Sequence, residues 1–214
     1  MTDEEAFLDK RTQQLKTQWL TGTWSGSCSG FSPSSPPKRF SKADWDSLDP
    51  SVKNAVLPFV KRDFNTLMLS GPTRAGKTHA AWGTVFGCLL RTEKCLAVDW
   101  ATLYQYLFNA TGFPSEDQRS AGEHLRAYRN AGLLFLDEFG LSAITNPQIS
   151  NGLFKLLNDR YNDPECFTIF TTSKPKELLV QEFGAPLVDT RVFGSLSVMM
   201  NKHKAVEVKR GVNG

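Results

Sequence analysis

The 214-residue sequence has few of the features that mark secreted, membrane-spanning or zinc-stabilised proteins. It contains only four cysteines, none in a C-x-x-C pair and none with a histidine at zinc-finger spacing, so a disulfide framework is not expected. No apolar run approaches the ~20 residues that a membrane helix needs, and the N-terminus M-T-D-E-E is acidic, unlike a secretory signal. We therefore expect a cytoplasmic protein that makes no membrane contact, with reduced thiols and with Cys88 and Cys95 buried.

A strong charge imbalance is also missing. The formal net charge is only +3, which permits contact with nucleic acid without demanding it. The composition, 40% hydrophobic and 22% charged, is ordinary for a soluble protein. A chain of this length can bury a core without disulfides or metals, and it suits one globular domain with an appendage.

The appendage is expected at the N-terminus. Residues 3–20 read as a helix with acids in its first turn and an incomplete apolar face. Such a helix would dock either on its own domain or on a partner protein, and we assign residues 1–20 to partner binding. Residues 21–38 are dominated by Ser, Gly and Pro, which is typical of a linker. The globular domain is expected to span 39–214.

Within that domain, short apolar segments alternate with segments of helical periodicity. Because the apolar segments are uniformly apolar and do not alternate, they predict a parallel sheet covered by helices on both faces, an α/β fold. Strands are expected at 66–70, 94–99, 132–137, 166–172 and 195–208. A helix is expected within 45–60, with Pro50 near its start, and further helices at 78–90, 101–108, 120–129, 148–162, 175–183 and 186–192.

The first chemistry-bearing motif is the loop G-P-T-R-A-G-K-T between the first expected strand and the following helix. Gly71 and Gly76 allow the backbone to wrap phosphates closely, Lys77 can reach the β- and γ-phosphates, and Thr78 can ligate Mg²⁺. Arg74 stands where a small residue is common. It either projects outward, which we favour, or touches the nucleotide or nucleic acid. The expected nucleotide contacts run along the loop into the helix: Gly71, Pro72, Thr73, Arg74, Ala75, Gly76, Lys77, Thr78 and His79.

The second motif is L-L-F-L-D-E, an apolar strand that ends in two acids. In this Walker B arrangement Asp137 would hold Mg²⁺ through its water shell, and Glu138 would orient and activate the attacking water. The adjacent carboxylates favour ATP hydrolysis over phosphoryl transfer to a small molecule.

Two later segments contain further candidates. The strand at 166–172 ends in Thr172, Ser173 and Lys174, which either sense the γ-phosphate or form the polar exit of a plain core strand. Arg191 is either a solvated charge or an arginine finger that stabilises charge on the transferred phosphoryl group of a neighbouring subunit. The candidate catalytic residues are therefore Lys77, Glu138, Ser173, Lys174 and Arg191.

The order of these motifs resembles the AAA+ ATPases, and the details resemble the DnaC/IstB branch of bacterial and phage helicase loaders and transposition helpers. The loop continues as G-K-T-H-A-A, and the acidic strand reads L-L-F-L-D-E-F-G. The resemblance covers roughly 39–210 and implies a three-layer α/β/α P-loop domain with a central parallel sheet and no full helical lid. The chain departs from the pattern at Lys174, where the family has Asn, and at Arg191, which lies one place after the family's arginine.

The resemblance also implies partners. ATP and Mg²⁺ would bind between subunits of a homo-oligomer, and the N-terminal helix would grip a replicative helicase or another replication or transposition protein. Single-stranded DNA would contact the region 101–129. The basic C-terminal segment around Lys202 to Arg210 either touches a phosphate backbone or protects a strand edge. The cations and rings considered for DNA contact are Tyr104, Tyr106, Arg119, Arg126 and Arg129.

A helicase loader that acts in DNA replication is the leading interpretation. The alternatives are an IstB-like transposition helper with the same ATPase core, a small viral helicase of superfamily 3, and a nucleotide-gated interaction module with little hydrolysis. The sequence pattern at Lys174 and at the acidic strand argues against the superfamily 3 helicase.

Overall fold

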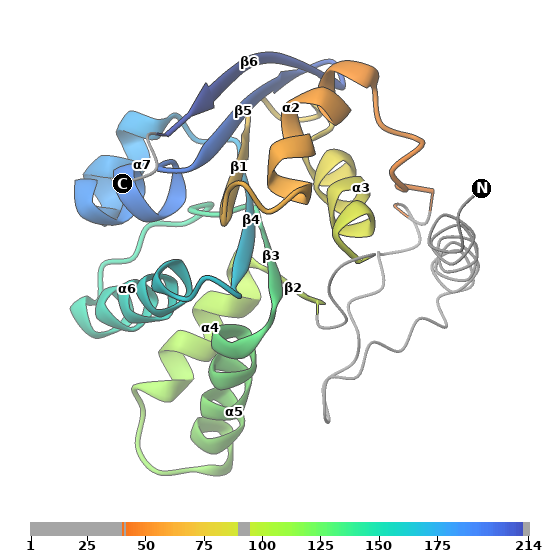
Figure 1. The fold of residues 1–214 in the computed structure, drawn as a ribbon. Coiled ribbons are helices and arrows are strands. Elements are labelled where there is room, and N and C mark those ends of the chain that lie inside the picture. Colours follow the sequence, from red (N-terminus) through yellow and green to blue (C-terminus); the bar gives the residue numbers. More distant parts are fainter. Residues whose placement is uncertain (1–39, 41, 90–94, 212–214) are drawn as a thin grey trace, which may run out of the picture.

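The computed structural model describes residues 40, 42–89 and 95–211, and these form one layered domain (Figure 1). The expected helix at 3–20 and linker at 21–38 lie outside the described residues. Among the helices in the described ranges, none is both long enough and apolar enough to cross a membrane.

The centre of the domain is a sheet with the strand order β2-β3-β4-β1-β5-β6. Neighbouring strands from β2 to β5 pair in parallel, and β6 pairs antiparallel with β5. The strands are β1 (Thr66–Ser70), β2 (Cys95–Asp99), β3 (Leu133–Asp137), β4 (Phe167–Thr172), β5 (Leu196–Asn201) and β6 (Lys204–Arg210). This order confirms the expected parallel sheet.

The expectation of one continuous strand at 195–208 is wrong, because the chain reverses there. Lys202 and His203 take left-handed backbone angles, with φ of 45° and 63°, and make the tight turn between β5 and β6. Sequence reasoning missed this turn because neither position is Gly, Asn or Asp, the usual residues of such hairpin turns.

Helices cover both faces of the sheet (Figure 1). They are α2 (Pro50–Val60), α3 (Lys77–Leu89), α4 (Trp100–Ala110), α5 (Glu116–Asn130), α6 (Pro147–Asn162), α7 (Lys176–Phe183) and the π-helical segment η2 (Pro186–Val192). Side-chain caps fix several starts. The Asp49 carboxylate accepts from the Ser51 N–H, and the Ser115 hydroxyl accepts from the Gln118 N–H. The first cap agrees with the expected helix within 45–60 that has Pro50 near its start, and the second explains why α5 begins earlier than periodicity suggested.

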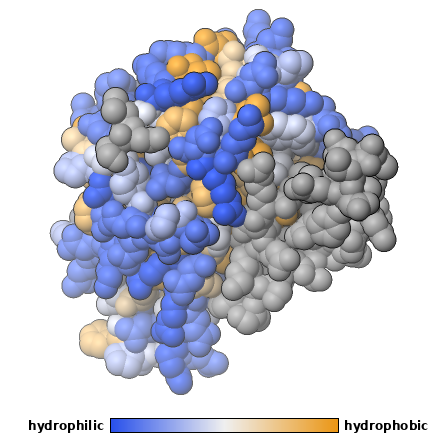
Figure 2. All heavy atoms as spheres, viewed as in Figure 1, coloured by the Kyte–Doolittle hydropathy of each residue, from blue (hydrophilic) through white to orange (hydrophobic). Residues whose placement is uncertain are grey.

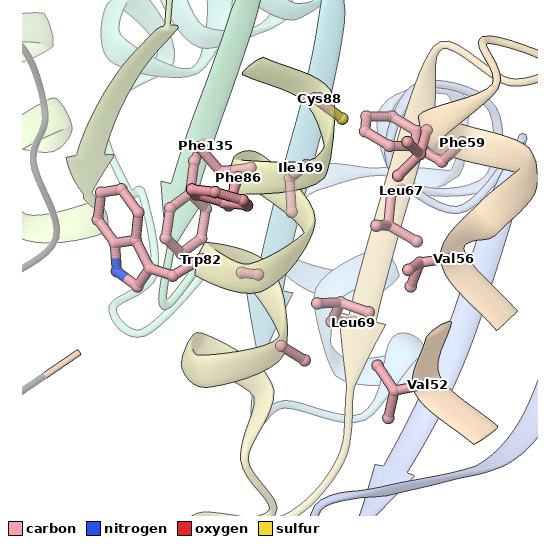
Figure 3. Packing of buried hydrophobic residues seen from close by; sticks show 14 of the residues in the cluster. Val52, Val56, Phe59, Leu67, Leu69, Trp82, Phe86, Cys88, Phe135 and Ile169 are labelled. Atoms are coloured by element: carbon pink, nitrogen blue, oxygen red, sulfur yellow. The ribbon is translucent and has the colours of Figure 1, made fainter. Parts of the chain in front are cut away.

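Two buried hydrophobic clusters lie on opposite faces of the sheet. Alternate residues of β3 point to opposite sides, so Phe135 packs in one cluster and Leu134 in the other. Figure 3 shows the first cluster, where Trp82 of α3 meets Phe135 edge-on with ring centroids 5.2 Å apart. The predicted burial of Cys88 and Cys95 is confirmed. In the view of Figure 2, hydrophilic side chains cover most of the outer surface.

A buried arginine joins the segment before β3 to the start of β4. The Arg160 guanidinium, 1% exposed, donates to the carbonyl oxygens of Tyr128 and Ala131 at 2.7 Å, to the Phe167 carbonyl at 2.6 Å and to the Thr168 hydroxyl at 3.0 Å. Burial lowers the pKa of Arg160 to about 10. Its fork of donors ties the connection before β3 to the start of β4.

Candidate active site

The glycine-rich loop and the ends of β3 and β4 meet at one edge of the sheet. Because β1, β3 and β4 are parallel, their carboxyl ends all lie at this edge (Figure 1). Ligands of open α/β sheets bind in the crevice beyond these ends. A cleft of about 540 Å³ lies there, and its lining includes Gly76, Lys77, Thr78, Glu138 and Ser173.

The loop has the backbone geometry of an anion-binding turn. Gly71, Arg74 and Gly76 take positive φ values of 141°, 65° and 90°. A Cβ at Gly71 would lie 2.2 Å from the Met200 carbonyl oxygen, so the approach of β5 permits only glycine there. Arg74 is exposed and lines the cleft. The loop then opens directly into the N-terminus of α3, where backbone N–H groups favour anions.

Lys77 is the most buried cation of the cleft, at 8% exposed. Its Nζ donates to the Gly71 carbonyl at 2.9 Å, the Pro72 carbonyl at 2.8 Å and the Ser173 hydroxyl at 2.9 Å. Burial lowers the pKa of Lys77, and the carboxylates of Asp137 and Glu138 partly offset this effect. All three acceptors are neutral, so the anionic oxygens of a phosphate would bind this ammonium more strongly.

Asp137 is held by two threonine hydroxyls. Thr78 Oγ1 donates to Asp137 Oδ1 at 3.1 Å, and Thr171 Oγ1 donates to the same oxygen. Thr171 Oγ1 also accepts from the Glu138 backbone N–H at 2.9 Å. Sequence reasoning considered Thr172, Ser173 and Lys174 at the end of this strand and missed Thr171. The pairing of Leu136 with Phe170 sets the residues that follow them side by side, and only the strand register reveals this.

Glu138 begins a tightly fixed turn. Its φ is 58°, a left-handed value that is uncommon for a residue with a side chain. The next residue anchors the turn, because the Phe139 N–H donates to the Thr171 carbonyl at 2.7 Å and the Phe139 carbonyl accepts from the Thr172 hydroxyl at 2.9 Å. The Glu138 side chain is exposed at the cleft. A rigid backbone therefore presents an accessible carboxylate where water can reach it.

The two remaining candidates on the loop after β4 have different surroundings. Ser173 contacts Lys77 directly, whereas the Lys174 ammonium bonds both carboxylate oxygens of Glu182 on α7 at 2.7 Å. Lys174 lines the cleft, but its charge is already paired. Of the two, Ser173 is the one whose side chain joins the Lys77 network.

Arg191 lies apart from these residues, on η2. Its Nε and Nη2 donate to Asn158 Oδ1 at 3.2 and 2.9 Å, and its guanidinium lies 4.8 Å from the centre of the Tyr161 ring. It does not line the cleft. The fold therefore does not bring Arg191 to the site of its own chain, and a role at a neighbouring chain stays a prediction.

The comparisons with known proteins bear on this geometry. The model of the family described as IstB-like ATP binding protein matches residues 42–210. The chain belongs to this family. None of the curated proteins compared with it matches.

Solved structures show the same fold at low sequence identity. A structure of the DnaC helicase loader matches with a TM-score of 0.60 and 18% identity over 77% of this chain and 100% of that chain. A structure of DnaI matches with a TM-score of 0.63 and 16% identity, over 78% and 95%. AMPPCP-bound DnaA from Aquifex aeolicus matches with a TM-score of 0.60 and 16% identity over 75% of this chain, which spans 50% of the DnaA chain. The domain therefore has the AAA+ P-loop fold.

The residues of this family member fit a magnesium nucleotide. The oxygens of Thr78 and Asp137 are hard donors within 3.1 Å of each other, and Mg²⁺ in nucleotide sites uses one or two such protein ligands together with phosphates. Within the described residues there is no cluster of three or more His, Cys, Asp or Glu side chains that would favour another metal. The cleft volume lies in the usual range for small-molecule sites.

The residues considered for DNA contact lie on α4 and α5 rather than on the cleft. Tyr106 stacks on His124 with ring centroids 4.2 Å apart, and Arg129 pairs with Asp159 at 3.2 Å. Arg119 and Arg126 are exposed. On the C-terminal hairpin the five basic side chains are all exposed, namely Lys202, His203, Lys204, Lys209 and Arg210. Their contact with DNA stays a prediction.

Proposed function

We propose that this protein binds ATP with Mg²⁺ and hydrolyses it. The observation that supports this proposal is a pair of neighbouring hydrogen-bonded groups beside the exposed Glu138 carboxylate. One joins Lys77 to Ser173, and the other joins Thr78, Asp137 and Thr171. Lys77 itself joins Ser173 to the glycine-rich loop, and Thr78 joins the start of α3 to β3.

Each residue has a separate task in this proposal. The loop backbone and Lys77 hold the phosphates, and Thr78 and Asp137 hold Mg²⁺, which when bound neutralises charge on the phosphate oxygens. Glu138 orients water and accepts its proton. Thr171 keeps the Asp137 carboxylate and the Glu138 backbone in fixed positions, so the metal ligand and the base are set by the same hydroxyl.

We further propose that ATP turnover drives the loading of a replicative helicase onto single-stranded DNA. Support comes from the family match and from the likeness of the fold to the DnaC helicase loader and to DnaI. Residues 1–20 would grip the helicase, and Arg191 would complete the site of the neighbouring protomer in a homo-oligomer. An IstB-like transposition helper is the second candidate, because the matching family model is itself IstB-like.

The turnover of Glu138→Gln tests the enzymatic part of the proposal. This change keeps the size of the side chain and removes the base, so we expect ATP hydrolysis to fall by about 100-fold or more while ATP affinity is retained. Glu123→Gln, at an exposed position on α5, is the matched control. Equal and near-zero rates in the wild type and Glu138→Gln would favour a nucleotide-gated module without catalysis.

Partner capture tests the biological role. Affinity purification from the native host with ATP present should recover a replicative helicase, and deletion of residues 1–20 should abolish that recovery while ATP binding persists. Recovery of a transposase instead would favour the second candidate. A truncated protein that still captured the helicase would contradict the role given to residues 1–20.

A further inference from the structure

Three rings line the cleft beside the residues around Lys77 and Asp137. They belong to Phe40, His79 and His203, and none of the hydrogen bonds of Lys77 and Asp137 described above goes to them. They come from three separate parts of the chain: the segment before α2, the first turn of α3 and the turn between β5 and β6. The cleft therefore has flat rings in its lining as well as charged side chains.

The β5–β6 turn is fitted closely to the glycine-rich loop. The His203 N–H donates to the Ala75 carbonyl at 2.9 Å. The His203 ring lies over Gly76, where an added Cβ would come within 2.5 Å of His203 Nδ1. The left-handed backbone of Lys202 and His203 produces this position by reversing the chain at the cleft. The C-terminal hairpin thus places one side chain against the loop that holds the phosphates.

His79 extends the same wall. Its ring meets the His203 ring edge-on with centroids 6.4 Å apart, and its Nε2 lies 3.1 Å from the Ser47 hydroxyl. Imidazole and phenyl rings offer a flat face on which a flat heteroaromatic group can stack.

We propose that His203, carried by the β5–β6 turn, forms with His79 and Phe40 the wall against which the base of the bound nucleotide stacks. The inference rests on the proposed ATP binding and deepens it, because it assigns the base subsite to the C-terminal hairpin. Stacking against rings recognises the flat face that all bases share, so the wall adds affinity for a nucleotide over a bare triphosphate.

The experiment compares ATP with inorganic tripolyphosphate on the full-length chain, by calorimetry in the presence of Mg²⁺. His203→Asn removes the ring, and asparagine tolerates the left-handed backbone of the turn. We expect ATP to bind about 10-fold more weakly and tripolyphosphate to bind with unchanged affinity. His203→Tyr, which restores a ring, should recover most of the lost ATP affinity.

A matched control and the contrary outcomes make the result decisive. His124→Asn makes the same exchange on α5, outside the cleft lining, and should change neither affinity. Equal weakening of ATP and tripolyphosphate in His203→Asn would overturn the inference, because His203 would then act on the phosphates or on the loop. Unchanged ATP affinity would also overturn it. A wild-type chain that binds neither compound would instead refute the proposed ATP binding.

Discussion

The region around the glycine-rich loop and the η2 surface around Arg191 contain candidate site residues in very different settings. Around the loop, Lys77 is hydrogen-bonded to Ser173, and Thr78 to Asp137, all within one chain. On η2, the Arg191 guanidinium contacts Asn158 and Tyr161, and the cleft lies elsewhere. The first region is assembled by folding alone. The second has a catalytic task only if another protomer brings its own cleft to it.

Arg191→Ala gives the largest expected effect that bears on this comparison. If Arg191 completes a neighbouring site, turnover should fall by about 10³-fold while ATP affinity is kept, because a finger stabilises the transition state. Steady-state ATPase assays and a separate binding measurement check both parts.

Mixing two inactive variants separates a shared site from local damage. Arg191→Ala mixed with Lys77→Ala should regain part of the activity, because one chain supplies the loop and the other the arginine. A mixture as inactive as its components would contradict the neighbouring-site role and would leave Arg191 as a residue that supports η2 through Asn158.

Lys77→Ala is the next largest change and acts within one chain. Removing the buried ammonium should weaken ATP binding by about 100-fold, because a charge-assisted contact to phosphate is lost in a partly desolvated cleft. Calorimetric titration measures the effect, and Lys155→Ala, at an exposed position on α6, is the control. ATP affinity like that of the wild type would contradict the placement of phosphates at this loop.

Thr171→Val should have an intermediate effect. Asp137 loses a donor and the Glu138 N–H loses its acceptor, so we expect turnover about 10-fold lower and a higher Mg²⁺ requirement with little change in ATP affinity. Thr171→Ser should restore the activity. Thr84→Val removes another buried threonine hydroxyl, away from the site. It measures how much turnover falls when a buried hydroxyl outside the site is lost. Equal losses of turnover in Thr171→Val and Thr84→Val would contradict the positioning role that we give to Thr171.

The smallest predicted effect is a pH dependence of stability from His79. Its pKa is lowered in the fold by burial and by His203, against a weaker attraction from Asp44. The folded state therefore binds a proton at His79 less readily than the unfolded chain does. The contribution of neutral His79 to the free energy of unfolding is complete above pH 6.5 and decreases as the pH falls toward the lowered pKa. Urea unfolding between pH 5 and 7.5 should show a shallower decline in His79→Asn than in the wild type. Parallel curves for the two proteins would contradict the shift.

Much of the fold could be predicted from the sequence because its signals are local. The apolar runs that form β1, β3 and β4 are buried along nearly their whole length between two helical layers. Their composition alone therefore identified them. Arg160 was not identified, because its partners lie before β3 and along β4 and nothing near Arg160 in the sequence points to them. The same holds for the candidate site, where Thr171 was not predicted from the sequence.

The chemistry of the loop and of the acidic strand could be inferred from the residues alone, because Gly71 to Thr78 and Asp137–Glu138 are each contiguous in the chain. The sequence also indicated the family, which the match over residues 42–210 shows. The surroundings of those motifs became visible in the folded chain. Strand register placed Thr171 on Asp137, and an antiparallel turn placed His203 on Gly76. Both contacts join residues that are far apart in the chain. The positions of these residues in the sequence do not reveal the strand pairing that brings them together.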